Sequence, residues 1–390
     1  MFLPKAEMFS DKNQRARLTV LLALALFFLS WQAQGESEEH YTSYMVFQDG
    51  LLFAHIGEGR LVAVEPRSRS LRWSFQDPNL KGFVAPVFLG DRLFALATTP
   101  SWESVIVALE RATGKVVWRY PFVELAGNPS PVVCCNRVIV NNEYKTGRVV
   151  ALQADSGAVS WDTKDEPYHF FHPPAVSGSQ LYFVVIKKGA SEALGIGVID
   201  CCRGTIVRII SVEGIGVSYH PILLYQGKAI LISSDVHRGT VITLFDLEQE
   251  KKIWETKIPE EVVGLFPIIA NDRMVFGPGG VWVVGLTTGG VLLHHQTKQD
   301  VPPAAWFNGT VIFQSGPRTL RALRIDPERI LWESRLRAKV VSNVVLCGKV
   351  VCVQVSGAKL ALLDPTNGKV LGYIPLVEKA RKRLDPSPRQ

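Results

Sequence analysis

The sequence predicts an all-β protein, an eight-bladed β-propeller of four-stranded antiparallel blades. Three observations lead to this fold class: one short pattern recurs along the chain, its copies lie 38 to 47 residues apart, and the composition suits short strands joined by tight turns. A fixed period of this size is typical of repeat architectures, and it gives each unit room for four short strands. Seven blades are the alternative, but seven would leave one copy of the pattern unassigned.

The composition agrees with many short strands. Aromatic residues make up 9% of the 390 residues, and the chain has 32 Gly and 23 Pro. Aromatic and β-branched residues suit pleated strands, whereas Gly and Pro set the dihedral angles of turns. The net charge of +7 comes partly from the two ends, and no basic stripe with interleaved aromatic residues lies between them. A nucleic-acid partner is therefore not expected.

The repeated pattern ends in a tryptophan shortly after a turn glycine. Val107–Trp118 and Val150–Trp161 share this spacing, and Val62–Trp73 repeats it with Arg69 at the glycine position. Three weaker copies follow, and two further copies have lost the tryptophan. The eight equivalent positions are Trp73, Trp118, Trp161, Arg208, Trp254, His294, Trp332 and Gly372.

The recurrence itself indicates a structural role for the tryptophans. A tryptophan at one fixed place in each unit can bury about 200 Å² against the neighbouring unit, so a ring of them would join blade to blade. Catalytic residues would have no reason to recur in this way. The expected blade-docking residues are Trp73, Trp118, Trp161, Trp254 and Trp332.

The motif Ala-Leu-Asp-x-x-Thr-Gly-x-x-x-Trp resembles the PQQ-like propeller repeat, whose tryptophans form docking contacts between blades. The resemblance is strong in the second, third and eighth units and faint in the fourth and sixth. The layout is most similar to the propeller subunit of the outer-membrane β-barrel assembly machinery, although the cysteine of a lipid-attachment site is absent. The resemblance implies a non-catalytic scaffold that binds envelope or outer-membrane proteins through blade-edge loops.

The same resemblance raises an alternative, a PQQ- and calcium-dependent dehydrogenase or a small-ligand binder that uses the axial channel. Such dehydrogenases carry a vicinal disulfide over the cofactor, and this chain has two vicinal pairs, Cys134–Cys135 and Cys201–Cys202. A ring between Cys134 and Cys135 needs a distorted or cis peptide, which costs a few kcal/mol, whereas Cys201–Cys202 lies in the turn before Gly204, where such a ring forms more easily. We therefore expect both pairs to be structural, and we expect no cofactor and no catalytic residue.

The remaining candidate sites are weak. His169 and His172, like His294 and His295, have no cysteine or carboxylate at ligand spacing, whereas zinc takes three or four protein ligands. No metal site is expected from them. The glycine run 277–280 lacks the Lys and Ser or Thr of a phosphate-binding loop and indicates a turn between strands.

Cys347 and Cys352 flank the predicted turn Gly348-Lys349. In a two-residue hairpin, residue 347 faces residue 350, so Cys352 lies diagonally on the same face with its Cα about 7–8 Å away, beyond ordinary disulfide reach. No bond is expected between these two cysteines.

Both ends of the chain predict segments outside the propeller. Residues 1–17 are polar and basic, Leu18–Trp31 is an apolar run, and the small residues Ala33 and Gly35 follow, as in a secretory signal peptide. We expect residues 1–35 to be cleaved, with an uncleaved membrane anchor as the alternative, and residues 36–377 to form a periplasmic propeller. Residues 378–390 form a basic tail that could associate weakly with anionic membrane or cell wall.

Overall fold

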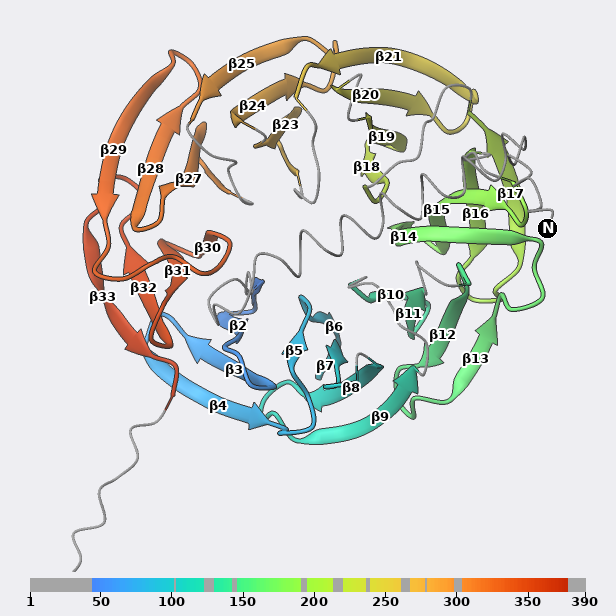
Figure 1. Ribbon diagram of the computed structural model, residues 1–390, viewed down its shortest axis with the longest axis horizontal. Coiled ribbons are helices and arrows are strands. Elements are labelled where there is room, and N and C mark those ends of the chain that lie inside the picture. Colours follow the sequence, from blue (N-terminus) through green and yellow to red (C-terminus); the bar gives the residue numbers. More distant parts are fainter. Residues whose placement is uncertain are drawn as a thin grey trace, which may run out of the picture. The chain divides into compact units, whose positions relative to one another are not determined.

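The computed structural model describes residues 44–101, 103–122, 130–141, 146–190, 195–212, 220–235, 239–260, 267–277, 279–297 and 304–377. In these residues the chain forms eight antiparallel sheets, which are arranged as blades around a ring (Figure 1). The predicted eight-bladed propeller is confirmed, and the alternative of seven blades is wrong. The predicted signal peptide and basic tail lie outside the described residues.

Each blade is built from consecutive strands, with the innermost strand first and the outermost strand last. Blades 1 and 2 contain β1 (Met45–Gln48), β2 (Leu51–His55), β3 (Arg60–Glu65), β4 (Ser70–Gln76), β5 (Gly82–Phe83), β6 (Val87–Leu89), β7 (Arg92–Thr98), β8 (Ser104–Glu110) and β9 (Val116–Phe122). Blades 3 and 4 contain β10 (Val132–Cys134), β11 (Arg137–Asn141), β12 (Val149–Gln153), β13 (Val159–Asp162), β14 (Tyr168–Ser177), β15 (Gln180–Lys187), β16 (Gly195–Asp200) and β17 (Ile206–Ser211).

The second half of the ring follows the same plan. Blades 5 and 6 contain β18 (Leu223–Tyr225), β19 (Lys228–Asp235), β20 (Gly239–Asp246), β21 (Lys251–Ile258), β22 (Ile268–Ala270), β23 (Arg273–Phe276), β24 (Gly280–Gly285) and β25 (Val291–Gln296). Blades 7 and 8 contain β26 (Ala305–Phe307), β27 (Thr310–Gly316), β28 (Thr319–Arg324), β29 (Arg329–Arg335), β30 (Val345–Cys347), β31 (Val350–Val355), β32 (Lys359–Leu363) and β33 (Val370–Pro375). Blade 2 differs from the others because the short β5 pairs with β7 beside β6.

The core lies between the blades rather than within one central mass. In β7, Leu93 and Ala95 pack against blade 1, whereas the alternate residues Phe94 and Leu96 pack against blade 3. Successive side chains of a strand point to opposite faces, and both faces of a blade are covered by its neighbours. This is why the middle strands read as continuous apolar runs rather than as alternating apolar and polar residues.

Within the described residues, the ring closes between blade 8 and blade 1 without a strand shared by the two blades. Leu52 and Val62 of blade 1 share an apolar cluster with Leu360 and Leu362 of blade 8. The side chain of Asn343 accepts a hydrogen bond from the backbone nitrogen of Met45 at 2.8 Å and donates one to its carbonyl oxygen at 3.1 Å. Side-chain packing and these two hydrogen bonds therefore hold the first blade to the last.

A membrane-spanning helix is not found within the described residues, since none of their segments forms a helix of sufficient length and hydrophobicity.

Candidate functional site

The five predicted docking tryptophans lie on outermost strands, and each contacts the following blade. Their Nε1 atoms donate hydrogen bonds of 2.8–3.0 Å to backbone carbonyl oxygens of that blade. The pairs are Trp73 with Arg111, Trp118 with Ala154, Trp161 with Cys201, Trp254 with Leu286 and Trp332 with Pro365. The stability that these contacts contribute stays a prediction.

The indole rings also cover turn glycines of the following blade. A Cβ atom added to these glycines would lie 2.5–2.7 Å from the indole ring, which is too close for any residue with a side chain. The pairs are Gly114 with Trp73, Gly157 with Trp118, Gly204 with Trp161, Gly289 with Trp254 and Gly368 with Trp332. All five glycines have a positive φ, between 72° and 76°, so the turn itself also favours glycine.

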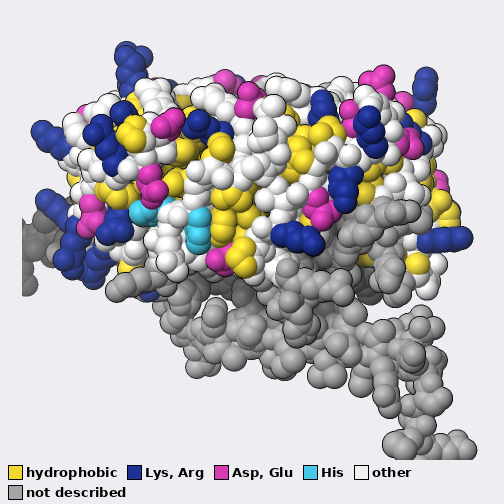
Figure 2. Space-filling model, turned by 90° about the horizontal axis from the view of Figure 1, so that it is seen from above, with side chains coloured by type: hydrophobic (Ala, Val, Ile, Leu, Met, Phe, Trp, Pro, Cys, Tyr) yellow, Lys and Arg dark blue, Asp and Glu magenta, His cyan; other side chains and the backbone are white. Residues whose placement is uncertain are grey.

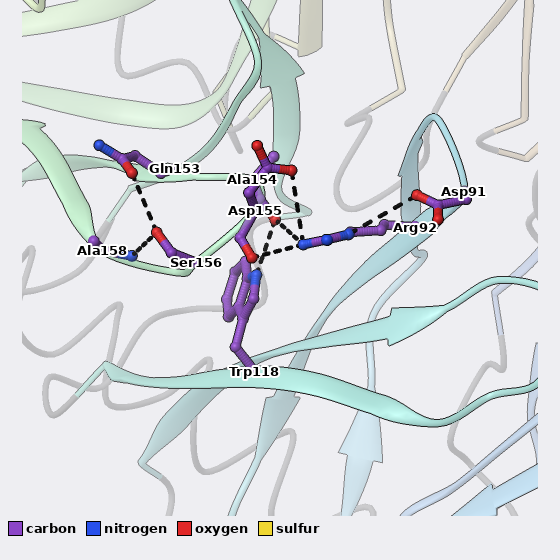
Figure 3. Close-up of polar contacts among 8 residues, drawn as sticks. All are labelled: Asp91, Arg92, Trp118, Gln153, Ala154, Asp155, Ser156 and Ala158. Atoms are coloured by element: carbon purple, nitrogen blue, oxygen red, sulfur yellow. Dashed lines mark hydrogen bonds and ion pairs between the residues drawn. The ribbon is translucent and has the colours of Figure 1, made fainter.

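Figure 3 shows the junction between blades 2 and 3, where an arginine joins the tryptophan. Arg92 donates hydrogen bonds to the carbonyl oxygens of Ala154 and Asp155 at 3.1 and 2.7 Å. The Trp118 indole donates to the same Ala154 oxygen at 2.9 Å. Two side chains of blade 2 thus converge on one turn of blade 3 and satisfy its outward-facing carbonyl groups.

At two junctions, other residues take the places of both the tryptophan and the turn glycine. Between blades 4 and 5, Arg208 takes the tryptophan position and donates to Glu250, which takes the glycine position, at 3.0 Å. Between blades 8 and 1, the bare backbone of Gly372 lies against the guanidinium of Arg69. At both of these junctions, the blade that has lost its tryptophan faces a turn that carries a larger residue in place of glycine.

The tryptophan-equivalent position predicted in the sixth unit is wrong by one residue. The turn glycine that contacts the previous blade is Gly289 rather than Gly290. The strand irregularity between Val283 and Val284 then pairs Val283 with Leu293, as Ala108 pairs with Trp118 in blade 2. Leu293 packs between blades 6 and 7. His294 has its side chain on the other face of β25, where it stacks on Trp282 with ring centroids 3.7 Å apart.

The two vicinal cysteine pairs do not form vicinal disulfides. Instead Cys134 bonds to Cys201 and Cys135 bonds to Cys202, with Cα atoms 6.1 and 5.3 Å apart. The two-residue turn between β10 and β11 in blade 3 lies beside the turn between β16 and β17 in blade 4, so each cysteine faces a partner across the junction. This crosswise pairing was not predicted from the sequence, because it depends on the packing of two blades. The structural role expected for the two pairs stays a prediction.

The prediction that Cys347 and Cys352 remain unbonded is wrong. Cys347 faces Val350, as the predicted hairpin requires, yet a disulfide joins Cys347 to Cys352. Their Cα atoms are 6.2 Å apart, within disulfide reach. The right-handed twist of a two-stranded ribbon brings one diagonal pair closer than a flat sheet would.

The histidine pairs do not converge on a common site. His169 stacks on Phe171, and burial lowers its pKa with help from the charge of Lys188. His295 contacts the carboxylate of Glu328 in blade 7 at 2.9 Å, on the opposite face from His294. Among the described residues, the group of side chains compact enough to hold a metal ion consists of Cys134, Cys135 and Cys201.

A wide-open, mostly apolar cavity of about 350 Å³ lies at the inner strands of blades 6, 7, 8 and 1. Phe47 of β1, Ile269 of β22, Trp306 of β26 and Leu346 of β30 line it. Among the described lining residues, the polar side chain is that of Asn343, which is hydrogen-bonded to the backbone of Met45. By contrast, the outer side of the molecule in Figure 2 mixes basic, acidic and hydrophobic side chains. The cavity was not predicted from the sequence, because its walls come from four separate units.

The cavity does not fit PQQ with a calcium ion. Calcium takes six to eight oxygen ligands, and carboxylates are the usual protein donors. Among the described residues that line the cavity, none is a carboxylate or a basic side chain that could pair with the carboxyl groups of PQQ. The vicinal disulfide that marks the PQQ dehydrogenases is also replaced here by the two bonds between blades.

Comparison with known proteins gives a family match over most of the chain. The family model described as "Outer membrane protein assembly factor BamB" matches residues 29–191 and 237–384. Among solved structures, BamB from Moraxella catarrhalis superposes with a TM-score of 0.58 and 14% identity, covering 84% of this chain and 92% of that one. A europium-containing methanol dehydrogenase gives a TM-score of 0.56 and 11% identity, covering 83% and 82% of the two chains. At these identities both structures show the shared fold alone.

The curated relatives that match are enzymes, and the matches are partial. Polyvinylalcohol dehydrogenase of Sphingopyxis sp. (strain 113P3) is 31% identical over 160 residues, which are 37% of this chain and 23% of the relative. The 1-butanol dehydrogenase (quinone) of Thauera butanivorans is 25% identical over 143 residues, which are 33% of this chain and 21% of the relative. The chain thus spans less than a quarter of the length of these relatives.

Proposed function

The chain belongs to the BamB family of PQQ-repeat propellers, and from this membership we propose that it is a non-catalytic scaffold that binds another protein of the cell envelope. The observation that carries the proposal is the family match, which extends over both halves of the ring. The family description names an outer membrane protein assembly factor. In its finer form, the proposal is therefore a periplasmic role in the assembly of outer-membrane proteins, with residues 1–35 as the signal peptide.

The apolar inner-strand cavity is the surface that we propose for the partner. Its walls carry Phe47, Ile269 and Trp306, and aromatic and large apolar side chains in a recess are typical of the residues that dominate binding energy. Ile269 is 37% exposed, so its side chain is accessible from solvent. A partner would place apolar side chains of its own here and exclude water from them.

The test is crosslinking of the tagged full-length chain in its native cells, followed by identification of the captured proteins. Ile269→Asp places a charge in the cavity and should reduce capture of the partner at least tenfold. Ile253→Asp is the matched control, because Ile253 is 41% exposed and lies on the outer strand β21. Equal capture by the two variants would contradict the cavity as the contact, and the absence of any specific partner would contradict the scaffold function.

The quinone-dependent relatives support a second candidate, a propeller that binds a quinone cofactor near its axis. Purified protein dialysed against PQQ and calcium, and then assayed for oxidation of primary alcohols with an artificial electron acceptor, separates the two functions. The scaffold proposal predicts no retained PQQ and no alcohol-dependent dye reduction. Retention of PQQ together with such activity would establish the enzyme instead.

A further inference from the structure

Three of the four cysteines at the junction of blades 3 and 4 form a compact sulfur cluster, and the fourth, Cys202, is bonded to one of them. The Sγ atoms of Cys134, Cys135 and Cys201 all lie within 4.8 Å of one another, and Cys202 joins them through its bond to Cys135. Cys134 and Cys201 are 7% and 0% exposed, whereas Cys135 is half-buried and Cys202 is exposed. The cluster therefore has one side in the apolar core and one side open to solvent.

Contacts other than the disulfides hold the turn of Cys201 and Cys202 in place. The backbone nitrogen of Cys201 donates to the carbonyl oxygen of Ser179 at 2.8 Å, and the Trp161 indole donates to the carbonyl oxygen of Cys201 at 2.8 Å. Asp200 accepts hydrogen bonds from the backbone nitrogens of Cys202 and Arg203 at 2.8 and 2.9 Å. Reduction of the two disulfides would leave all of these contacts intact.

The surroundings also suit thiolates. The guanidinium of Arg137 donates to the carbonyl oxygen of Cys135 at 2.7 Å, and its charge favours ionised sulfur nearby. Ile139 and Leu181 pack with Cys134 and Cys201 in the apolar cluster of this junction. Such a shell keeps water from the inner half of a metal site and orients its ligands.

We propose that the reduced protein binds one zinc ion through Cys134, Cys135, Cys201 and Cys202. Four thiolates are a standard ligand set for zinc, which binds them tetrahedrally. Each disulfide takes two electrons and becomes two thiols: a dithiol supplies the electrons and two protons and is itself oxidised to a disulfide, whereas a phosphine supplies the electrons and water supplies the protons and the oxygen of the phosphine oxide. Each thiol releases its proton when its sulfur binds the ion, so four protons leave and the site carries two negative charges. Oxidised and zinc-bound forms would thus be alternative links between the same two blades.

The test uses the whole chain, reduced with a phosphine under anaerobic conditions and checked for native near-ultraviolet circular dichroism. Cobalt(II) alone is the probe, because tetrahedral thiolate ligands give it intense charge-transfer and visible absorption bands. We expect one cobalt ion per chain, displaced by zinc, with the melting temperature of the reduced protein raised by either ion. The oxidised protein should bind neither ion at this site.

Two variants separate this site from the other thiols. Cys201→Ser should abolish the stoichiometric cobalt spectrum. The double variant Cys347→Ser with Cys352→Ser should leave the spectrum unchanged, because that pair lies in blade 8. A reduced and folded protein that gives no thiolate spectrum would overturn the proposal. If reduction unfolds the chain, zinc must restore the native dichroism, and failure to do so would overturn the proposal equally.

Discussion

His55 shows how one buried side chain makes the stability of the ring depend on pH. Its side chain lies beside the ring of Phe83 at the junction of blades 1 and 2, and it is 5% exposed. Burial lowers the pKa of this imidazole to about 4, although a backbone hydrogen bond involving Lys81 opposes the shift. The native state therefore holds His55 neutral at a pH where the unfolded chain is protonated.

The pKa of His55 in the folded protein lies below the unfolded value of 6.5, so protonation of this imidazole favours the unfolded state. The stabilisation is fully present above pH 6.5 and is lost as the pH falls from there toward 4, by about 3 kcal/mol in total. Thermal unfolding between pH 7 and pH 4 measures this loss. His55→Gln should flatten the dependence, whereas the control His295→Gln should leave it in place. An unchanged slope in His55→Gln would show that another group is responsible.

Two glycines allow the cost of a clash with tryptophan to be measured separately from the backbone strain of a positive φ. Gly157 and Gly178 have φ of 72° and 58°, but a Cβ would lie 2.7 Å from Trp118 at the first and within 4 Å of nothing at the second. Gly178→Ala should cost about 1 kcal/mol, the strain of a positive φ. Gly157→Ala should cost about 1–3 kcal/mol more, because the indole must move. Urea unfolding measures both, and equal costs would contradict close tryptophan–glycine packing.

At the scale of the elements, the eight junctions between blades show which features of the repeat could be predicted from the sequence. Seven of the eight tryptophan-equivalent positions follow from the spacing, because a turn and an outer strand are local features. The sixth was misplaced because Gly289 and Gly290 both satisfy the local pattern. The cysteine pairing and the cavity could not be predicted from the sequence, because they depend on which turns and strands of different blades lie side by side.

The paired loss of tryptophan and glycine predicts an energetic coupling between neighbouring blades. Arg208→Trp alone should destabilise the protein, because the indole would meet Glu250 in place of a glycine. Glu250→Gly, which also relieves a φ of 51°, should rescue that variant. A double-mutant cycle measured by thermal unfolding should give a favourable coupling of about 0.5–3 kcal/mol. Strictly additive effects of the two substitutions would show that residues 208 and 250 do not contact each other as the tryptophan and glycine do at the other five junctions.

At the scale of the whole molecule, the ring is expected to unfold as a unit. Each of the eight apolar clusters joins two neighbouring blades, including the first and the last, so a blade separated from its neighbours would expose both faces. The ring positions the four inner strands that form the apolar cavity. We therefore propose that stability and partner binding depend on different residues, namely the outer-strand tryptophans and the inner-strand cavity.

The most direct test of whether stability and partner binding depend on different residues compares the variants Trp118→Ala and Ile269→Asp. Two quantities are measured for each variant: its melting temperature, and its capture of the partner at a temperature below the melting range. Trp118→Ala should cost about 3 kcal/mol of stability, as expected for emptying an aromatic packing site, and it should leave capture unchanged. Ile269→Asp should leave the melting temperature nearly unchanged and lose capture. A Trp118→Ala protein that melts normally, or that is folded and captures nothing, would contradict the account.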